Sequence, residues 1–536
     1  MVLLDGTCTL SREMVGNKGY GINLMRGLGL PVPPAFCVTT EACAAYLGGD
    51  VDVVTRSWPR ISAMLSVLEG QTSRTFGCGP SPLMVSVRSG AAQSMPGMLD
   101  TVLNLGIDDD VHQALAVEFD SAFADDVRSR FDDMYRRIVL GDNRLPDQEG
   151  YGDPHAQLRA AIEAVFRSWH SPRAAAYRAH HGIGDDGATA VVVQAMVFGN
   201  VNEKSGTGVL FSRNPMTGAN EIFGEWLGNA QGEDVVSGAA DCRPIDELRS
   251  AHPGVFAELT TAAERLETVL GDVQDIEFTV EDGRLWLLQT RTAKRSAQAA
   301  VRLALGLRDA GLIEDADVLH RVTPAQVRSL LSASLQPETR LSAELLASGV
   351  PATPGVASGK AYADVDAALD AADRGEDVIL VRPSTSPEDV AGMLAARAIV
   401  TDVGGATSHA AVVSRELDRP AVVGCGRGVS AALDGRLVTV DGSVGEVRAG
   451  LLDLTAWSER DTPDLVRLAE IAMRLSPLKA HPSGHHPRLS DTSEAAISDA
   501  LAEGRVDVVS DTPLVAMLTA FNAVRDEQSP VPSRGR

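Results

Sequence analysis

The 536-residue chain has few aromatic residues, a deficit of basic ones and few cysteines, and each shortage excludes a class of protein. Aromatic residues make up only 4% of the chain beside 50 glycines, a composition typical of α/β proteins rather than large β-sandwiches. The net charge of −24 provides no broad basic surface, so nucleic acid is not an expected partner. No apolar run is long enough to cross a bilayer, so no membrane partner is expected either.

The six cysteines are scattered rather than grouped. None forms a C-x-x-C pair, and none lies in a Cys/His cluster with the spacing of zinc ligands. Scattered cysteines suit a reducing compartment, and the N-terminal residues lack the charged and apolar regions of a signal peptide. The sequence therefore predicts a cytoplasmic protein, and its length predicts about two to four domains.

Short apolar stretches alternate with helical ones and divide the chain into regions. "PLMVSVRSG" and "AVVVQAMVFG" have the composition of strands, and "QDIEFTVEDGRLWLLQTR" predicts a hairpin that turns at Asp282-Gly283. Helical spacing between the first two strands predicts a helical insertion over about 108–185. Polar helices are expected over 296–345, a compact domain of short strands over 346–450, and amphipathic helices with a disordered tail over 451–536.

The stretch "GGATSHAAVVSREL", residues 404–417, places a histidine where chemistry is favoured. The two glycines permit a tight path after the preceding strand, and Thr407 or Ser408 can cap a helix that starts near His409. Free N–H groups at a helix start favour an anion and disfavour an imidazolium, which keeps the ring neutral and nucleophilic. A phosphoryl group on this ring would be stabilised, although a lone histidine at a helix start is more often structural.

The predicted hairpin carries two pairs of polar residues. Asp275 and Glu277 lie two apart on a strand and share one face, which suits a Mg²⁺ site beside a nucleotide phosphate. Gln289 and Arg291 share a face of the returning strand, where an amide can bind a nucleoside edge and a guanidinium can bind phosphate. Each pair alone is more often an ordinary solvated face, so the assignment depends on further motifs.

Those motifs occur in a fixed order along the chain. "GNKGYGINLMRGLGLPVPPAFCVTT", "MVSVRSGAAQSMPGMLDTVLNLG", "GEWLGNAQGEDVVSG" and "RPSTSPEDVAGMLAARAIVTDVGGATSHAAVVSRELDRPAVVGCG" resemble segments of the pyruvate phosphate dikinase family of PEP-utilising enzymes. The resemblance covers roughly residues 12–302 and 345–450. It implies an α/β multidomain fold with an ATP-grasp domain over 1–295, a helical linker over 296–345, and a swivelling β/β/α phosphohistidine domain over 346–450. A short helical C-terminal region would follow over 451–536.

The resemblance also implies roles for particular residues. His409 would carry a phosphoryl group, and Thr407 would be a target for a regulatory kinase. "SMPGM" matches the family's glycine loop over the phosphates, with Ser94, Met95 and Gly97. ATP with Mg²⁺ would be bound by Lys18, Arg88, Asp275, Glu277, Gln289 and Arg291, with Asp275 and Glu277 as the metal ligands.

These matches predict a phosphotransferase that converts ATP, orthophosphate and His409 into phosphohistidine, AMP and pyrophosphate. "RSGAAQSMPGM", which starts at Arg88, resembles the dikinase version of this segment rather than the synthase version. The 86 residues after Gly450 lack the cysteine and the strand–helix alternation expected of the family's PEP/pyruvate barrel, so transfer to pyruvate is expected only with a separate barrel protein. Two alternatives stay open: phosphohistidine donation to another protein or small molecule, and a non-catalytic ATP sensor.

The C-terminal residues carry the weakest functional signal. Their amphipathic helices suit a cover for the histidine domain, a partner site or a homodimer contact. His481, His485 and His486 lie in a Pro/Gly-rich stretch, which favours a flexible surface loop over a metal site. Residues 296–345 and 451–475 are the candidate hinges for a swivelling domain.

Overall fold

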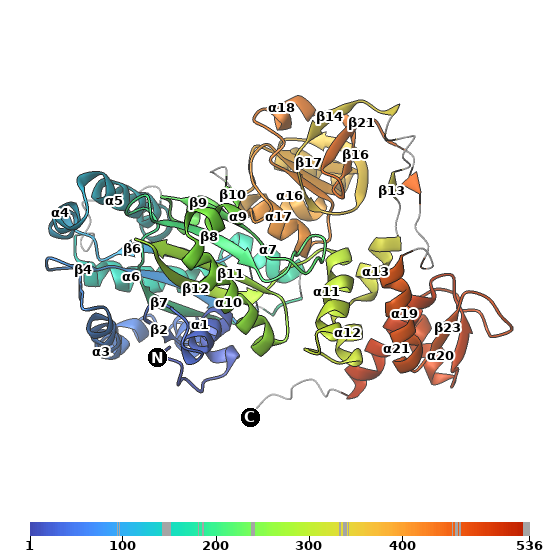
Figure 1. Ribbon diagram of the computed structural model, residues 1–536, viewed down its shortest axis with the longest axis horizontal. Helices are drawn as coiled ribbons and strands as arrows, with labels where there is room; N and C mark the ends of the chain where they lie inside the picture. The colour runs from blue at the N-terminus through green and yellow to red at the C-terminus, as the bar shows by residue number, and fades with distance from the viewer. Residues whose placement is uncertain are drawn as a thin grey trace.

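The computed structural model shows an N-terminal α/β body, a second α/β domain above it, and a smaller helical subdomain at one side (Figure 1). It describes residues 1–93, 95, 97–141, 152–180, 182–184, 187–236, 242–331, 334–335, 340, 342–452, 454–455, 459 and 462–528. Over these ranges, no helix combines the length and apolar character needed to traverse a bilayer.

The N-terminal domain begins with a five-stranded sheet of order β1-β2-β7-β5-β6. Every residue of β7 is buried, which explains why its sequence is apolar apart from Thr189 and Gln194. Helices α1 (Arg12–Gly27), α2 (Thr40–Leu47) and α3 (Val53–Thr72) pack beside this sheet. The strands are β1 (Val2–Leu3), β2 (Ala35–Val38), β5 (Val85–Ala91), β6 (Thr101–Leu105) and β7 (Thr189–Ala195).

A helical insertion separates β6 from β7, where the helical spacing predicts one. Three of its helices begin at aspartate caps: Asp108, Asp120 and Asp153 each accept a hydrogen bond from a backbone N–H of the first turn. The elements are α4 (Asp109–Glu118), α5 (Ser121–Tyr135), η1 (Arg136–Leu140), α6 (Pro154–Arg167), η2 (Ser168–His170) and α7 (Pro172–His180).

A second sheet of the N-terminal domain has the order β10-β9-β8-β11-β12. The predicted hairpin is present: β11 and β12 pair antiparallel and are joined at Asp282-Gly283. Helix α10 (Pro253–Leu270) and α1 contribute to one apolar core with both sheets, so the two lobes are joined by shared burial. The remaining elements are β8 (Gly206–Phe211), β9 (Phe223–Gly228), α8 (Gly232–Val236), β10 (Arg243–Pro244), α9 (Asp246–Ala251), β11 (Gln274–Glu281) and β12 (Arg284–Thr292).

The histidine domain, defined here as residues 345–449, is built on an eight-stranded sheet of order β14-β21-β20-β16-β17-β18-β19-β15. Strands β16 to β19 run parallel, and apolar side chains of α15, α16 and α17 cover one face of the sheet. The elements are β14 (Leu345–Ser348), β15 (Val350–Thr353), β16 (Val356–Tyr362), α15 (Val365–Asp373), β17 (Val378–Arg382), η3 (Pro387–Asp389), α16 (Val390–Ala395), β18 (Ala398–Thr401), α17 (His409–Glu416), β19 (Ala421–Val423), α18 (Val429–Leu433), β20 (Leu437–Asp441) and β21 (Glu446–Ala449).

The expected helical linker and the expected C-terminal helices form one subdomain with a common core. Val301 and Leu305 of α11 (Ala297–Asp309) pack in the same apolar cluster as Leu468 of α19 (Pro463–Leu475) and Leu518 of α21 (Pro513–Gln528). Helices α12 (Asp315–Arg321) and α13 (Pro324–Leu331) belong to it as well. The 296–331 segment is therefore a packed partner of the C-terminal residues rather than a free connector.

This C-terminal subdomain, defined here as α11–α13 with residues 462–528, also corrects one expectation. Its sequence predicts only helices, yet β23 (Lys479–His481) and β24 (Asp507–Val509) pair in parallel around α20 (Glu494–Ala502). Each strand is only three residues long, Lys-Ala-His in β23 and Asp-Val-Val in β24, which is too short for a period to identify it in the sequence. The predicted tail, residues 529–536, lies outside the described residues.

Two chain crossings connect the histidine domain to the rest of the molecule. One contains β13 (Ser334–Leu335) and the other β22 (Leu454–Thr455), and these strands pair antiparallel. Figure 1 shows β13 beside the gap between the histidine domain and the C-terminal subdomain. The predicted hinges 296–345 and 451–475 therefore meet in one short ribbon.

Candidate functional site

His409 is the first residue of α17, as the sequence predicts. Ser408 is the helix cap, and its hydroxyl accepts a hydrogen bond from the Ala411 N–H at 3.4 Å. The imidazole Nδ1 lies 3.1 Å from the hydroxyl of Thr385. The other ring nitrogen, Nε2, is buried and has no hydrogen-bond partner among the described residues. One nitrogen is therefore positioned by a neighbour while the other is left for a ligand.

Burial lowers the pKa of His409, against the opposing influence of Asp389 and Glu388. The ring is therefore neutral at pH 7, as the helix-start argument predicts. A neutral ring with its proton on Nδ1, facing Thr385, leaves the Nε2 lone pair available to an electrophile. The arrangement suits nucleophilic chemistry at Nε2.

A cavity of about 890 Å³ joins this ring to the N-terminal domain. Its walls come from β5, β11, β12, the glycine-containing loop after β5, and the histidine domain. Most of the predicted site residues meet there: Lys18, Arg88, Glu277, Gln289, Arg291, Met95, Gly97, Thr407 and His409.

Three cations converge on one side of the cavity. Arg88 pairs with Glu277 at 2.8 Å, and Arg291 pairs with Asp275 at 2.7 Å. Burial and the neighbouring Arg88 hold the pKa of Lys18 well below its usual value, although Glu277 opposes them. Burial tends to raise the pKa of Glu277, but these cations outweigh it and the pKa is lowered. Positive charge therefore exceeds negative charge here, which suits a polyphosphate.

The hairpin register explains how these side chains come together. Asp275 lies directly opposite Arg291, and Glu277 lies directly opposite Gln289. Cross-strand neighbours of this kind are within contact distance on one face of the sheet. The Gln289 amide oxygen lies 3.5 Å from the Arg88 guanidinium, so Gln289 and Glu277 both position Arg88.

Two predicted residues, Asp275 and Ser94, are placed differently from the rest. Asp275 is only 2% exposed and is not part of the cavity wall, because Arg291 takes one of its carboxylate oxygens. The other oxygen, Oδ1, is buried without a donor among the described residues. Ser94 lies outside the described residues, whereas Met95 is buried and packs.

Glu225 on β9 fastens the histidine domain to the N-terminal domain. Its carboxylate accepts hydrogen bonds from the N–H groups of Ala406 and Thr407, at 2.9 and 3.3 Å, and from the Thr407 hydroxyl. A Cβ atom on Gly405 would lie 2.0 Å from the Glu225 carboxylate. A side chain at position 405 would therefore push the Glu225 carboxylate out of its present position, which explains part of the G-G-x-T-S-H pattern.

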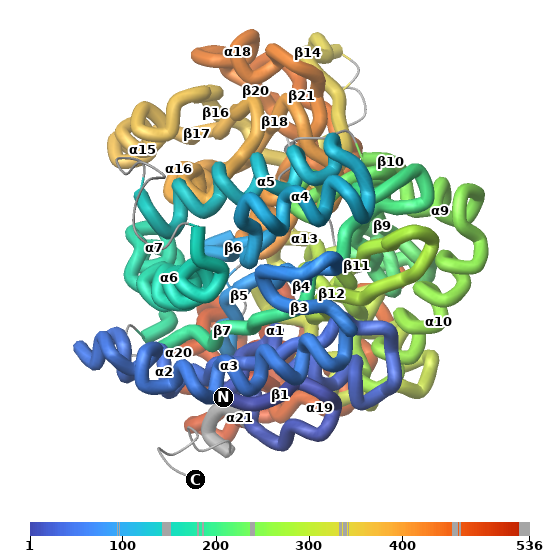
Figure 2. Tube along the Cα trace, turned by 90° about the vertical axis from the view of Figure 1, so that its left-hand side faces the viewer, coloured from blue at the N-terminus to red at the C-terminus, as the bar shows by residue number. Residues whose placement is uncertain are grey.

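A second contact between the domains involves α17 at its other end. Glu416, 7% exposed, accepts hydrogen bonds from Lys294 at 2.7 Å and from the Tyr177 hydroxyl. Beside it, Val390 of α16 packs into an apolar cluster with residues of α7 and the glycine-containing loop. Figure 2 shows α7 and α16 next to one another at this junction. Both ends of α17 are thus held by the N-terminal domain.

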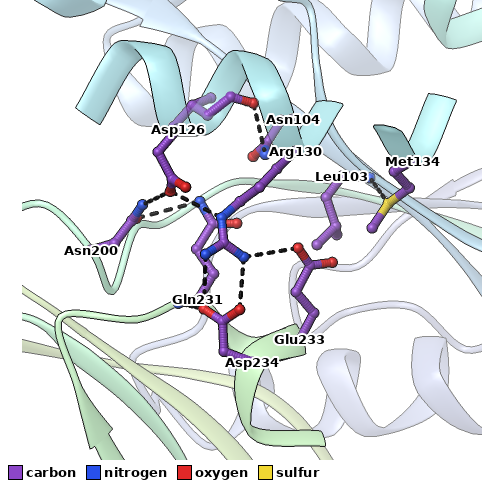
Figure 3. A network of polar contacts seen from close by, with 10 residues as sticks. Leu103, Asn104, Asp126, Arg130, Met134, Asn200, Gln231, Glu233 and Asp234 are labelled. Atoms are coloured by element: carbon purple, nitrogen blue, oxygen red, sulfur yellow. Dashed lines mark hydrogen bonds and ion pairs between the residues drawn. The ribbon is translucent and has the colours of Figure 1, made fainter. Parts of the chain in front are cut away.

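The far wall of the cavity is braced by Arg130 of the helical insertion (Figure 3). Its guanidinium bonds Asp126 one turn earlier at 2.9 Å, and also Glu233 and Asp234 of α8 at 3.0 and 2.9 Å. Asn200 donates to Asp126 at 2.8 Å and completes the network. Glu233 lines the cavity, so Arg130 fixes that wall to the insertion.

Sequence reasoning missed the residues that join the domains. Glu225 and Glu416 lie within quoted motifs, but nothing local distinguishes them from solvated acids. Gln194, Thr207 and Thr279 also line the cavity from strands that the apolar pattern identifies only as core. A hydroxyl or amide within an otherwise apolar strand is the one signal that marks such positions.

Comparison with known proteins agrees with this arrangement. A family model described as "Pyruvate phosphate dikinase, AMP/ATP-binding domain" matches residues 53–253 and 241–306. A model described as "PEP-utilising enzyme, mobile domain" matches residues 374–445, which include His409. The predicted α/β multidomain fold, with its nucleotide-binding and mobile domains, is thereby confirmed.

Individual relatives extend the match to most of the chain. A "Pyruvate, phosphate dikinase" of Clostridium symbiosum is 39% identical over 82% of this chain and 56% of its own length. One of Rhizobium meliloti (strain 1021) is 40% identical over 82% and 56%, and a chloroplastic one of Zea mays is 38% identical over 83% and 52%. The chain thus spans about half the length of these curated relatives.

Proposed function

Because the chain belongs to the pyruvate phosphate dikinase family, we propose that it is an ATP-dependent phosphotransferase that forms phosphohistidine at His409. The observation that carries this proposal is one cavity that contains both the Nε2 of His409, which has no hydrogen-bond partner among the described residues, and the convergent cations Lys18, Arg88 and Arg291. An ATP sensor would need the cations but not a histidine Nε2 that faces the same cavity. The enzymatic function is therefore favoured over the sensor.

The reaction transfers two phosphoryl groups of one ATP. One passes to orthophosphate and gives pyrophosphate, and another bonds to Nε2 of His409 and leaves AMP. The Nδ1 proton, opposite Thr385, is retained until the phosphoryl group leaves. Because the protein forms few covalent bonds itself, the cations that neutralise the phosphates and the seating of His409 provide the rate enhancement.

A magnesium ion bound with ATP fits the residues of this site. Glu277 presents a carboxylate to the cavity, and Asp275 keeps one buried oxygen, Oδ1, without a donor among the described residues. Hard cations prefer carboxylate oxygens, so Glu277 would hold Mg²⁺ from the cavity wall, and Asp275 would join it through a rearrangement of Arg291. The ion would supply further charge neutralisation on the phosphates. Arg291 would then share Asp275 with the metal or shift toward phosphate.

A second step must move the phosphoryl group from His409 to an acceptor. We propose pyruvate as the first acceptor, because the relatives are named as pyruvate, phosphate dikinases. Pyruvate would be bound by a separate barrel domain or protein, and the transfer would convert it into phosphoenolpyruvate. The paired crossings β13 and β22 provide the hinge about which the histidine domain would swivel. Donation to another protein or small molecule is the alternative acceptor. Cys8, Cys37, Cys43, Cys78 and Cys425 are free thiols, which supports the proposed cytoplasmic location.

Regulation at Thr407 is also proposed. A phosphate on its hydroxyl would meet the Glu225 carboxylate that now accepts from that hydroxyl. Two anions in one buried contact repel strongly, so a kinase acting on Thr407 would hold the histidine domain away from ATP.

The first test follows labelled ATP with orthophosphate, with and without pyruvate. We expect the wild type to form AMP, pyrophosphate and an acid-labile phosphoryl group, and His409→Ala to form none of them. His485→Ala, which removes an exposed histidine, is the matched control and should behave as wild type. ATP binding without phosphohistidine or pyrophosphate under any condition would overturn the enzyme proposal and support a sensor.

A second prediction concerns Gly97, which lies beside the His409 ring in the loop after β5. Gly97 has φ 71°, and a Cβ atom there would lie 3.1 Å from Nε2 and Cδ2 of His409. A contact of 3.1 Å forces the ring to move by a few tenths of an ångström. Because a displacement of about 1 Å can cost roughly 100-fold in rate, we expect Gly97→Ala to slow phosphorylation of His409 by a smaller factor, about tenfold or less. ATP affinity, measured by calorimetry, should change little.

Gly29→Ala is the matched control for this prediction. Gly29 has nearly the same dihedral, φ 70°, but a Cβ there meets nothing within 4 Å. It carries the same backbone cost, about 1 kcal/mol, without the contact to His409. Equal rates for the two variants would show that crowding at His409 is unimportant.

A further inference from the structure

Three potential metal ligands meet in the C-terminal subdomain, far along the chain from the nucleotide cavity. They are His481 at the end of β23, His486 in the loop after it, and Asp507 at the start of β24. One ligand atom from each side chain lies within 4.8 Å of the others. His481 Nε2 is 2.8 Å from the Asp507 carboxylate, and the rings of His481 and His486 stack with centroids 5.0 Å apart.

Backbone hydrogen bonds fix all three segments. The His481 carbonyl accepts from the Ser510 N–H at 2.9 Å, beyond the end of β24. The loop that carries His486 is tied to β24 on its far side, because Pro487 accepts from the Val509 N–H at 2.8 Å and Leu489 donates to the Val509 carbonyl at 2.9 Å. A metal would therefore find its ligands already gathered, which lowers the entropic cost of binding.

From this geometry we propose that His481, His486 and Asp507 form a binding site for a borderline divalent transition metal such as Zn²⁺. Two imidazoles and one carboxylate are ligands that Zn²⁺, Co²⁺ and Ni²⁺ share, whereas Mg²⁺ prefers oxygen ligands only. The site would thus discriminate against the ion that accompanies ATP. Water would complete the coordination, because the three side chains are partly exposed.

The spacing requires only small side-chain adjustments. Zinc bonds of about 2.0–2.1 Å in a tetrahedral site place neighbouring ligand atoms roughly 3.3 Å apart. The distance between His481 Nε2 and the Asp507 carboxylate, now 2.8 Å, must increase slightly. The ligand atom of His486, which lies within 4.8 Å of the other two, must move closer to them. Side-chain rotation is enough for both changes. An ordinary His481–Asp507 ion pair explains the 2.8 Å contact alone, but it gives His486 no reason to stack beside it.

Two basic residues, Lys479 and Arg488, lie on the segments that carry the cluster. Lys479 lies on the same strand face as His481, two residues before it, and Arg488 is paired with Asp511 at 2.7 Å. The carboxylate that a cation would meet in this cluster is that of Asp507, which is now paired with His481. Occupation of the site would link β23, the loop and β24, and so would stabilise this part of the subdomain.

The test measures Zn²⁺ binding to the full chain by competition with a chromophoric chelator, after removal of bound metal. We expect one ion per chain, and a Co²⁺ spectrum with histidine and carboxylate ligands and no sulfur charge-transfer band. His486→Ala and Asp507→Asn should each weaken binding by about tenfold or more, since changes even behind the ligands cost 10–100-fold. His485→Ala removes an adjacent histidine outside the cluster and should leave binding unchanged.

Two results would overturn the proposal. One is that both the His486→Ala and the Asp507→Asn proteins still bind one Zn²⁺ per chain with wild-type affinity, which would place the metal elsewhere. The other is no saturable Zn²⁺ binding by wild-type protein, which would leave the cluster as an ion pair. His486 is exposed, so its replacement should not unfold the chain; thermal unfolding in chelator verifies this for every variant. Metal binding does not require phosphotransfer, so the result is independent of the proposed function.

Discussion

Replacement of Thr407 by glutamate is expected to reduce phosphorylation of His409 by roughly a thousandfold while leaving ATP affinity nearly unchanged. The new carboxylate would face Glu225, which now accepts three hydrogen bonds from Ala406 and Thr407. Two like charges about 4 Å apart repel by about 4 kcal/mol in a partly buried contact. Docking of the histidine domain would therefore fail, although the ATP-binding cations would remain in place.

Two further variants separate charge from lost hydrogen bonding. Thr407→Val removes only the hydroxyl donor, so a loss of about tenfold is expected. Glu225→Gln removes the opposing charge, so adding Thr407→Glu to it should cost much less than in the wild type. Rates of phosphohistidine formation from labelled ATP provide the readout. Equal effects of Thr407→Val and Thr407→Glu, or an unchanged penalty in the Glu225→Gln background, would reject the repulsion argument.

Local patterns predicted the parts of the site that are set within a few residues. The period of a strand placed Asp275 and Glu277 on one face, and helix-start chemistry placed Ser408 as the cap of the helix that carries His409. Both follow from backbone geometry alone, so no knowledge of the rest of the chain is needed.

Contacts between distant segments could not be predicted in this way. Glu225 and Thr407 are 182 residues apart, and Tyr177 and Glu416 are 239 apart. Which surface acids meet a partner depends on how two domains dock, and a single sequence contains no local trace of that choice. The same reason explains Asp275: its strand face was right, but only the opposite residue, Arg291, decides that it is withdrawn from the cavity.

The C-terminal subdomain illustrates a second limit. Strands β23 and β24 contain three residues each, too few for any periodicity, and their parallel pairing depends on the crossover through α20. The cluster of His481, His486 and Asp507 exists only because that pairing brings position 507 beside position 481. A histidine-rich loop in the sequence therefore indicated surface rather than a ligand set.

Replacement of Lys18 by methionine is expected to raise the stability of the protein and to lower its activity. Burial and the neighbouring guanidinium of Arg88 lower its pKa, so the folded protein holds this ammonium at a cost. Lys18→Met keeps most of the side-chain volume and removes the charge. We expect the midpoint of thermal unfolding to rise, by roughly 2 °C for each kcal/mol of charge burial avoided, while phosphorylation of His409 falls about 100- to 1,000-fold.

The stability difference between Lys18→Met and wild type should depend on pH, which a difference in packing alone would not. An unfolded lysine keeps its proton up to a pKa of roughly 10.4, whereas the folded state of Lys18 holds it less tightly. The unfolded chain therefore binds more protons between the two pKa values, and the wild type gains stability as pH rises toward about 10.4. The advantage of Lys18→Met over wild type should be full at lower pH and should shrink over that range.

Lys204→Met is the matched control, because Lys204 is exposed in the loop before β8. It should alter neither the unfolding midpoint nor phosphorylation. A Lys18→Met protein that unfolds at lower temperature than wild type would contradict the charge-burial argument, and one with full activity would remove Lys18 from the ATP site. If Lys18→Met raises the unfolding midpoint and lowers phosphorylation, the excess positive charge of the cavity destabilises the fold. A bound polyphosphate would then neutralise that charge and stabilise the protein.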